Sequence, residues 1–213
     1  TGLCYGQQRP VFFGGFDYYR DKSFDVNAFG NLNLGVQVYE WKFFAPEFGF
    51  NYYFGGLKER ELIHPEEPQA VAPYKSDAGF GAAVFSFAPK MIFGNKEAAL
   101  VLMPQYHVGT ISARGEFFRR DTDRYVLTEK ITHKESISFW SMAAGIQGQF
   151  YDSETLFFSL FLKYSFLDTK KPVGMIEEPL GYPPPNQGNI GGIGIGARVY
   201  FDLLKLIRMG AKG

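Results

Sequence analysis

Ile190-Gly-Gly-Ile-Gly-Ile-Gly-Ala-Arg-Val-Tyr-Phe201 is the segment that decides the fold, because its two faces differ completely. From Gly192 onward every second side chain is apolar, and those between are three glycines, an arginine and a tyrosine. Strict alternation indicates a β-strand between two different environments. Glycines beside an arginine are typical of the crowded interior of a small closed barrel, and an aliphatic face ending in an aromatic residue is typical of contact with lipid. We therefore expect the apolar face to point outward.

The composition agrees with this interpretation. The 213 residues include 22 basic and 22 acidic side chains, so there is no electrostatic case for nucleic acid as a partner. The mean hydropathy of −0.15 resembles that of a soluble protein, but a membrane barrel averages its lipid-facing and lumen-facing residues to a neutral value. No run of about 18 apolar residues occurs, which excludes a transmembrane helix.

The N-terminus and the single cysteine give limited information. One cysteine excludes an internal disulfide and a CxxC zinc site. Cys4 and Gly6 have the small size and spacing of a signal-peptidase site before Gln7. We expect residues 1–8 to be an N-terminal segment that retains the end of an export signal, and a plain flexible terminus is the alternative.

The same alternation recurs along the chain. It predicts eight strands, over residues 9–20, 30–39, 48–55, 78–87, 100–109, 140–150, 157–166 and 190–201. Leu34, Phe50 and Ile195 lie on the faces that we expect to meet lipid. The register of the fourth strand stays open, because Phe80, Ala82 and Val84 or Gly81, Ala83 and Phe85 form equally plausible outer faces.

The connections alternate between short and long. Prolines exclude regular structure from residues 57–77 and 167–189, and residues 111–135 form a polar hairpin that extends beyond the membrane. Pro104 removes a ladder donor from the fifth strand, so we expect a bulge there. The fold class is therefore all-β: a closed eight-stranded antiparallel up-and-down transmembrane β-barrel with short periplasmic turns and long external loops.

An outward apolar face leaves a polar interior. Its members are Asp17, Asn31, Asn33, Gln37, Asn51, Gln105, His107, Gln147, Gln149, Lys163 and Arg198. Charges held inside must be paired. Because the eighth strand must lie beside the first, we predict that Arg198 contacts Asp17 and that Lys163 joins them. Such a network fills the barrel and sets its register; a proton or ion path is the alternative, although eight strands leave little room for a channel.

The sequence contains no convincing catalytic, cofactor or metal site. Nothing in the spacing of His64, His107 and His133 requires a metal. A lipid-modifying enzyme could use His133, Ser136 and Glu135, but neighbouring residues of one strand point to opposite faces, so this trio is geometrically poor. We expect a protein that is not an enzyme and holds no cofactor.

The chain resembles the eight-stranded bacterial outer-membrane β-barrels of the OmpA and OmpX type, over residues 9–201. Gly196, Val199 and Phe201 are similar to the last-strand signal that the barrel-assembly machinery binds. In that family the signal usually ends the chain, whereas here a basic tail, residues 202–213, follows. The resemblance implies a location in the bacterial outer membrane, with both termini and this tail in the periplasm.

The fold leaves several functions open. The leading hypothesis is a non-enzymatic scaffold or accessory subunit of an outer-membrane protein complex for secretion or assembly. Its partners would be outer-membrane lipid and lipopolysaccharide, the assembly machinery, and other outer-membrane or periplasmic proteins. Alternatives are a free-standing adhesin-like barrel, a lipid-modifying enzyme and a soluble lipocalin-like carrier. The expected partner contacts are Arg119, Arg120, Arg124, Tyr125, Pro183, Pro184 and Pro185, together with the C-terminal tail.

Overall fold

A computed structural model describes residues 10–21, 28–62, 72–95, 97–149, 156–185 and 191–202 of the chain. The predicted N-terminal export segment and nearly all of the basic tail lie outside these residues. The elements, in chain order, are β1 (Val11–Asp21), β2 (Ala28–Gln37), β3 (Phe44–Glu61), β4 (Tyr74–Gly94), β5 (Ala99–Asp121), β6 (Arg124–Gln149), β7 (Leu156–Ser165), α1 (Lys170–Gly174) and β8 (Gly192–Phe201). Among them, no helix is both long and apolar enough to cross a membrane.

The strands form one closed barrel in which each strand pairs with its neighbours in the sequence and β8 pairs antiparallel with β1. This confirms the predicted fold. Closure pairs Phe12 with Phe201 and Asp17 with Gly196, so the last strand lies where its alternation placed it. A strand of ten residues, such as β7, rises about 3.3 Å per residue and at a tilt of roughly 40° spans roughly 25 Å, the height of the apolar band of a membrane barrel.

The side chains face the way the alternation predicts. Leu34, Phe50 and Ile195 are 64%, 41% and 65% exposed on the outside, whereas Asn33 and Arg198 are buried within and Gln147 is half-buried. The fourth strand adopts one of its two possible registers: Val84 points inward and Phe85 outward. A polar, filled interior inside an apolar wall is the reverse of a soluble ligand carrier, so the lipocalin-like alternative is disfavoured.

Exposed aromatic residues flank the aliphatic band at two levels. Trp41, Phe43 and Phe93 lie near the end with the short turns, and we call the second group, further along the strands, the upper belt. The upper belt comprises Tyr18, Tyr52, Phe54, Tyr106, Trp140 and Phe166. Membrane barrels carry such girdles where the hydrocarbon meets the headgroups. The chain is therefore a transmembrane β-barrel of the outer-membrane type.

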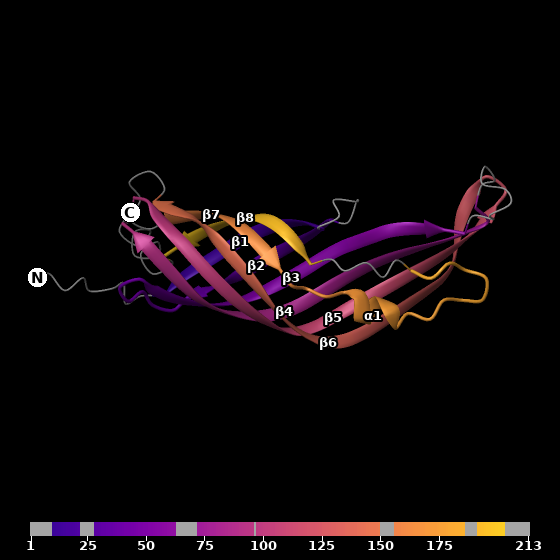
Figure 1. The fold of residues 1–213 in the computed structure, drawn as a ribbon, viewed down its shortest axis with the longest axis horizontal. Coiled ribbons are helices and arrows are strands. Elements are labelled where there is room, and N and C mark those ends of the chain that lie inside the picture. Colours follow the sequence, from indigo (N-terminus) through magenta and orange to yellow (C-terminus); the bar gives the residue numbers. More distant parts are fainter. Residues whose placement is uncertain are drawn as a thin grey trace, which may run out of the picture.

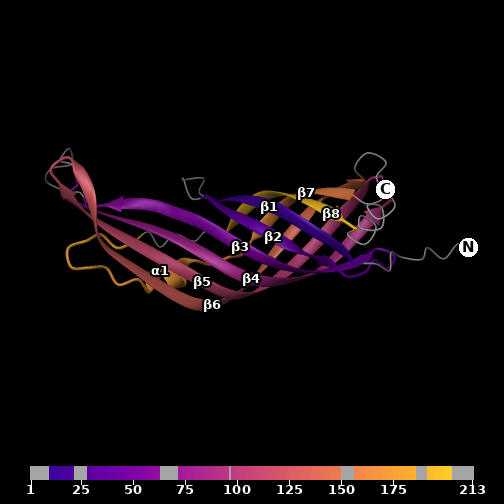
Figure 2. The same cartoon turned by 180° about the vertical axis from the view of Figure 1, so that it is seen from behind.

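The strands differ greatly in length, which makes the molecule one-sided. β1, β2, β7 and β8 have 10 or 11 residues, whereas β3 to β6 have between 18 and 26. The four long strands continue past the closed barrel as an open sheet, which we call the extension (Figure 1). Figure 2 shows the same arrangement from behind. The extension includes residues 57–61 and 74–77, which the sequence analysis assigned to a loop.

The segment from Phe166 to Pro185 crosses the extension, and we call it the strap. It begins where β7 ends, contains α1, and runs beside β5 and β6 (Figure 1). Leu167, Val173 and Ile176 of the strap are buried in one cluster with Ile111 and Phe117 of β5. A loop without regular structure was predicted here. Pro172 is tolerated in the short helix because it lies in the first turn, where its missing N–H has no partner to lose.

Prolines interrupt the wall without shifting its register. Pro46 of β3 lies opposite Pro89 of β4. The β4–β5 pairing stops after Phe87 and Tyr106 and resumes at Met91 and Leu102 in the same register, with Pro89 and Pro104 inside the gap. The predicted bulge at Pro104 is therefore wrong. Because proline has no N–H to donate, backbone hydrogen bonds are missing around Pro89 and Pro104. The paired stretches on both sides of this gap keep the register of the two strands unchanged.

Candidate functional site

The first part of the interior network centres on Asp17 of β1. Its Oδ2 accepts hydrogen bonds from Lys163 Nζ at 2.6 Å, Asn31 Nδ2 at 2.7 Å and Asn33 Nδ2 at 3.2 Å. All four side chains are buried. The predicted contact between Asp17 and Arg198 is wrong, because Arg198 ion-pairs with a different carboxylate. Lys163 is the cation that pairs with Asp17.

That other carboxylate is Glu47 of β3, which sequence reasoning missed. Glu47 accepts from Arg198 at 2.7 Å, from Lys90 at 2.9 Å and from the Tyr200 hydroxyl at 2.9 Å, all within the barrel. Gln37 Oε1 also accepts from Lys90, at 3.0 Å. Glu47 lies one residue before the predicted third strand, residues 48–55; extending the inward series of Gly49 and Asn51 back by one step would have found it.

His107 lies in a separate part of the interior. Its Nε2 is 2.8 Å from Ser141 Oγ, and its ring stacks on Phe139 at 4.6 Å between centroids. Ser141 donates to Gln105 at 3.3 Å, and the half-buried Gln147 accepts from Ser159 at 3.2 Å. Among the described residues, His107 Nδ1 has no hydrogen-bond partner, so no acid orients the ring as a Ser–His–Asp mechanism requires.

The charged groups of the interior are paired with one another. Charges in a low-dielectric interior are tolerated when ion pairs and hydrogen bonds satisfy them, and here each charged side chain has such a partner. The other trio considered from sequence is also not assembled: His133 and Glu135 are half-buried, and Ser136 is exposed on the opposite face. Glu135 is instead ion-paired with Lys171 of α1. No group of three potential metal ligands occurs among the described residues.

The expected contact residues at the tip of the extension have mixed surroundings. Arg119 and Arg124 are exposed. Arg120 is half-buried and its Nε donates to the carbonyl of Thr122 at 3.0 Å. Tyr125 is also half-buried and donates to the Ala72 carbonyl at 2.8 Å. Arg119 and Arg124 are therefore the more accessible members of the set.

The proline run requires a correction. Pro184 is exposed, whereas Pro183 and Pro185 are buried. Pro183 and Pro185 are therefore not a contact surface in this structure. They lie at the end of the strap, where Tyr182 packs on Tyr74 with ring centroids 4.7 Å apart. The physical reason is that prolines can pack against a sheet without leaving a buried N–H unsatisfied.

Strand β6 has an unpaired edge in the extension. It pairs with β5 from Arg124 onward, but its pairing with β7 begins only at Ser141. Within the described residues, the strap contacts this edge through one backbone hydrogen bond at its start, from the Phe166 N–H to the Trp140 carbonyl, and through side chains, such as Thr128 Oγ1 to the Tyr182 hydroxyl at 2.7 Å. Among the described residues, no strand pairs with residues 124–139 on that side, so their backbone donors and acceptors are available there.

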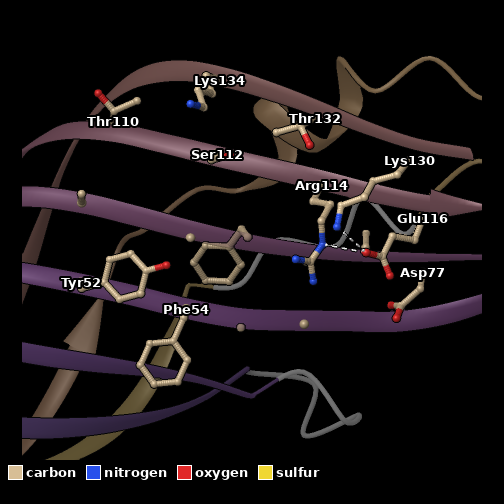
Figure 3. Close-up of a pocket in the computed structure, with 17 residues that line it drawn as sticks. Tyr52, Phe54, Asp77, Thr110, Ser112, Arg114, Glu116, Lys130, Thr132 and Lys134 are labelled. Atoms are coloured by element: carbon tan, nitrogen blue, oxygen red, sulfur yellow. Dashed lines mark ion pairs between the residues drawn. The ribbon is translucent and has the colours of Figure 1, made fainter.

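A groove of about 910 Å³ lies on the outward face of the extension. We call it the wall groove. In Figure 3, Tyr52 and Phe54 lie toward one end, and Arg114, Lys130, Glu116 and Asp77 lie toward the other. Its labelled lining residues are Tyr52, Phe54, Asp77, Thr110, Ser112, Arg114, Glu116, Lys130, Thr132 and Lys134. The groove was not predicted from the sequence, because its residues come from four strands.

The proposed assembly signal occupies both faces of β8. Val199 is exposed to the outside and Phe201 is half-exposed. Gly196 faces inward against Asp17, and a Cβ at this position would overlap the Asp17 carboxylate. Interior packing alone therefore requires a glycine at position 196.

The sequence matches no protein-family model and no curated protein. Solved structures similar to this chain include Ail, the attachment invasion locus protein of Yersinia pestis, in complex with the heparin analogue sucrose octasulfate. That alignment covers 92% of this chain and 95% of Ail, with 12% identity and a TM-score of 0.37. Another is the N-terminal β-barrel domain of Pseudomonas aeruginosa OprF, covering 92% and 98%, with 12% identity and a TM-score of 0.38. At these scores the likeness identifies no ligand, and the fold rests on the strand pairing described above.

Proposed function

We propose that the chain is a non-enzymatic accessory subunit or scaffold of a protein complex in the bacterial outer membrane, of the kind that serves secretion or assembly. Both termini would lie in the periplasm and the extension would lie outside the cell. The exposed apolar band would contact outer-membrane lipid and lipopolysaccharide. The barrel-assembly machinery would insert the chain by binding Gly196, Val199 and Phe201 of β8.

The unpaired edge of β6 is the observation that carries this proposal. An extended segment of a partner can add to such an edge, with main-chain hydrogen bonds giving affinity and side chains giving specificity. Lys130 and Lys134 on the same strand would oppose pairing between two copies of this edge, because charged side chains on edge strands disfavour self-association. A strand from a different protein is therefore a better occupant of this edge than a second copy of the chain.

The hydrogen-bond direction of this edge follows from one contact. Trp140 accepts, through its carbonyl, from the Phe166 N–H at 3.0 Å, so the backbone groups of Trp140 point toward the β7 side. Groups of alternate residues point the same way in a strand. The N–H groups of Ser136 and Ser138 therefore point to the free edge, whereas those of Ile137 and Phe139 point to β5.

This geometry defines a selective test. Replacing Ser136 and Ser138 by proline removes two edge donors and leaves the β5 ladder intact, and the Ser136→Ala, Ser138→Ala variant is the matched control. A photo-crosslinking residue at position 134, followed by purification in mild detergent, should yield one stoichiometric partner with the wild type and the alanine control. The proline variant should lose that cross-link and keep heat-modifiable migration in detergent.

A barrel that inserts into membranes but yields no stoichiometric partner would contradict the subunit proposal. In that case the second candidate, a free-standing adhesin-like barrel, is favoured by the exposed Arg119 and Arg124 at the tip of the extension. Binding of whole cells that display the chain to host-cell surfaces, with and without Arg119→Gln and Arg124→Gln, would test it.

A further inference from the structure

The wall groove begins where the outer surface changes from apolar to polar. Along β5, Tyr106 and Val108 face outward and are followed on the same face by Thr110 and Ser112. Along β6 the change comes just beyond Trp140. Tyr106 and Trp140 pack with ring centroids 5.0 Å apart in the upper belt. The groove therefore starts at the headgroup level and runs away from the hydrocarbon.

Small residues make the floor of the groove. Gly79, Gly81 and Ala83 of β4 line it, so the sheet there carries almost no side chains. The space over these glycines is used by polar groups of the walls. A Cβ at Gly79 would lie 3.6 Å from a terminal nitrogen of Arg114, and a Cβ at Gly81 would lie 2.9 Å from the Tyr52 hydroxyl. Hydrogen-bond donors thus overhang an open floor.

The ion pairs in the groove leave hydrogen-bond donors of its cations available to a ligand. Arg114 Nε and Lys130 Nζ both approach the same oxygen of Glu116, at 3.2 Å and 3.1 Å (Figure 3). Two cations thus share one carboxylate oxygen, and Lys134 adds a third cation to the lining. Burial raises the pKa of Asp77, and the nearby Glu59 and Glu116 carboxylates raise it further.

We propose that the wall groove binds the phosphate-bearing headgroup of a lipid in the adjacent leaflet. The cations and hydroxyl groups match phosphate oxygens, since Arg presents a planar fork of donors and Lys a point charge to them. Tyr52 and Phe54 lie at the membrane end, where they flank the path from the headgroup to the acyl chains. The continuity of the groove with the upper belt favours a lipid over a soluble phosphate compound. The inference rests on the proposed membrane location of the barrel.

Native mass spectrometry of the full chain, refolded in a neutral detergent, tests the proposal. The probes are dioleoyl phosphatidic acid, dioleoyl phosphatidylcholine and inorganic phosphate. Phosphatidic acid should bind at least about five-fold more tightly than phosphatidylcholine, and replacing Arg114 or Lys134 by glutamine should weaken it about five-fold for each cation removed. Equimolar inorganic phosphate should not compete, because it lacks the apolar part that the upper belt holds in place.

Two variants keep the test specific. Lys171→Gln removes a cation of α1 that is ion-paired with Glu135 and lies outside the groove, so it should leave lipid binding unchanged. Asp77→Asn removes an opposing charge and should tighten phosphatidic acid binding, a gain that misfolding cannot imitate. Equal affinity for phosphatidylcholine, undiminished binding by the Arg114→Gln, Lys134→Gln variant, or competition by inorganic phosphate would each overturn the inference. A chain that shows no heat-modifiable barrel would instead contradict the proposed membrane location.

Discussion

Close contact between Asp17 and Gly196 determines which residue can occupy each position. The two are direct partners across the seam between β1 and β8, and the Asp17 carboxylate fills the space that a side chain at position 196 would need. Lys163 lies on the other side, with its Cδ 3.0 Å from the same point. The carboxylate cannot move aside without breaking its ion pair.

Gly196→Ala should therefore lower the free energy of unfolding, by about 1–3 kcal/mol, the usual penalty for overpacking a filled interior. Urea unfolding in detergent micelles, followed by tryptophan fluorescence, measures the change. Gly56→Ala is the matched control, because a Cβ there meets only a backbone oxygen at 3.9 Å. Equal stability of the two variants would show that the Asp17 side chain can rearrange.

Lys163→Met removes one member of a buried ion pair and leaves the Asp17 charge without its cation. The expected loss is about 3–5 kcal/mol, and adding Asp17→Asn should restore much of it, because breaking a buried pair costs more than replacing both partners. The same urea titration, arranged as a double-mutant cycle, gives the coupling. A double variant that is less stable than Lys163→Met would contradict this assignment.

The residues also show where sequence reasoning ends. Alternation predicted which side chains face the lumen, since that depends only on the period of the strand. Alternation could not predict which of the interior side chains pair with one another. Arg198 reaches across to Glu47 on β3, although Asp17 lies on the adjacent strand, and this choice depends on how the barrel closes in three dimensions.

At the level of elements, the strap is the part that sequence patterns missed. Its helix is short and its apolar residues show no period, because they pack against a sheet that is distant in sequence. The wall groove was missed for a related reason: each strand contributes two or more of its residues, and no single strand displays the set. Local alternation predicts strands well and contacts between distant segments poorly.

Val173→Asp should detach the strap, because Val173 of α1 is buried in one cluster with residues of β5, and an unpaired carboxylate buried there is costly. Limited proteolysis should then cut within residues 166–185 at much lower protease concentration than in the wild type, with the barrel still heat-modifiable. Met175→Asp, at a side chain that is 55% exposed in the same segment, should leave the cleavage pattern unchanged. Equal resistance of both variants would mean that other contacts hold the strap.

For the whole molecule, the apolar band fixes how the barrel sits in a bilayer. Leu34→Arg places a charge within the band and should reduce the free energy of insertion into lipid vesicles by about 2–4 kcal/mol. Ser136→Arg, beyond the upper belt, should have little effect, because the penalty falls toward the interface. Folding into dilauroyl phosphatidylcholine vesicles, followed by gel shift, measures both. A similar loss for the two variants would contradict the position of the band.

The unequal strands have a consequence for neighbours in the membrane. A cylinder with a level rim looks the same from every direction, but this rim is cut obliquely, high over β3 to β6 and low over β1, β2, β7 and β8. The two sides of the molecule therefore differ when it is viewed within the plane of the bilayer. A neighbouring protein that approaches from the side of β3 to β6 meets the tall wall of the extension, whereas one that approaches from the side of β1, β2, β7 and β8 meets only the short strands.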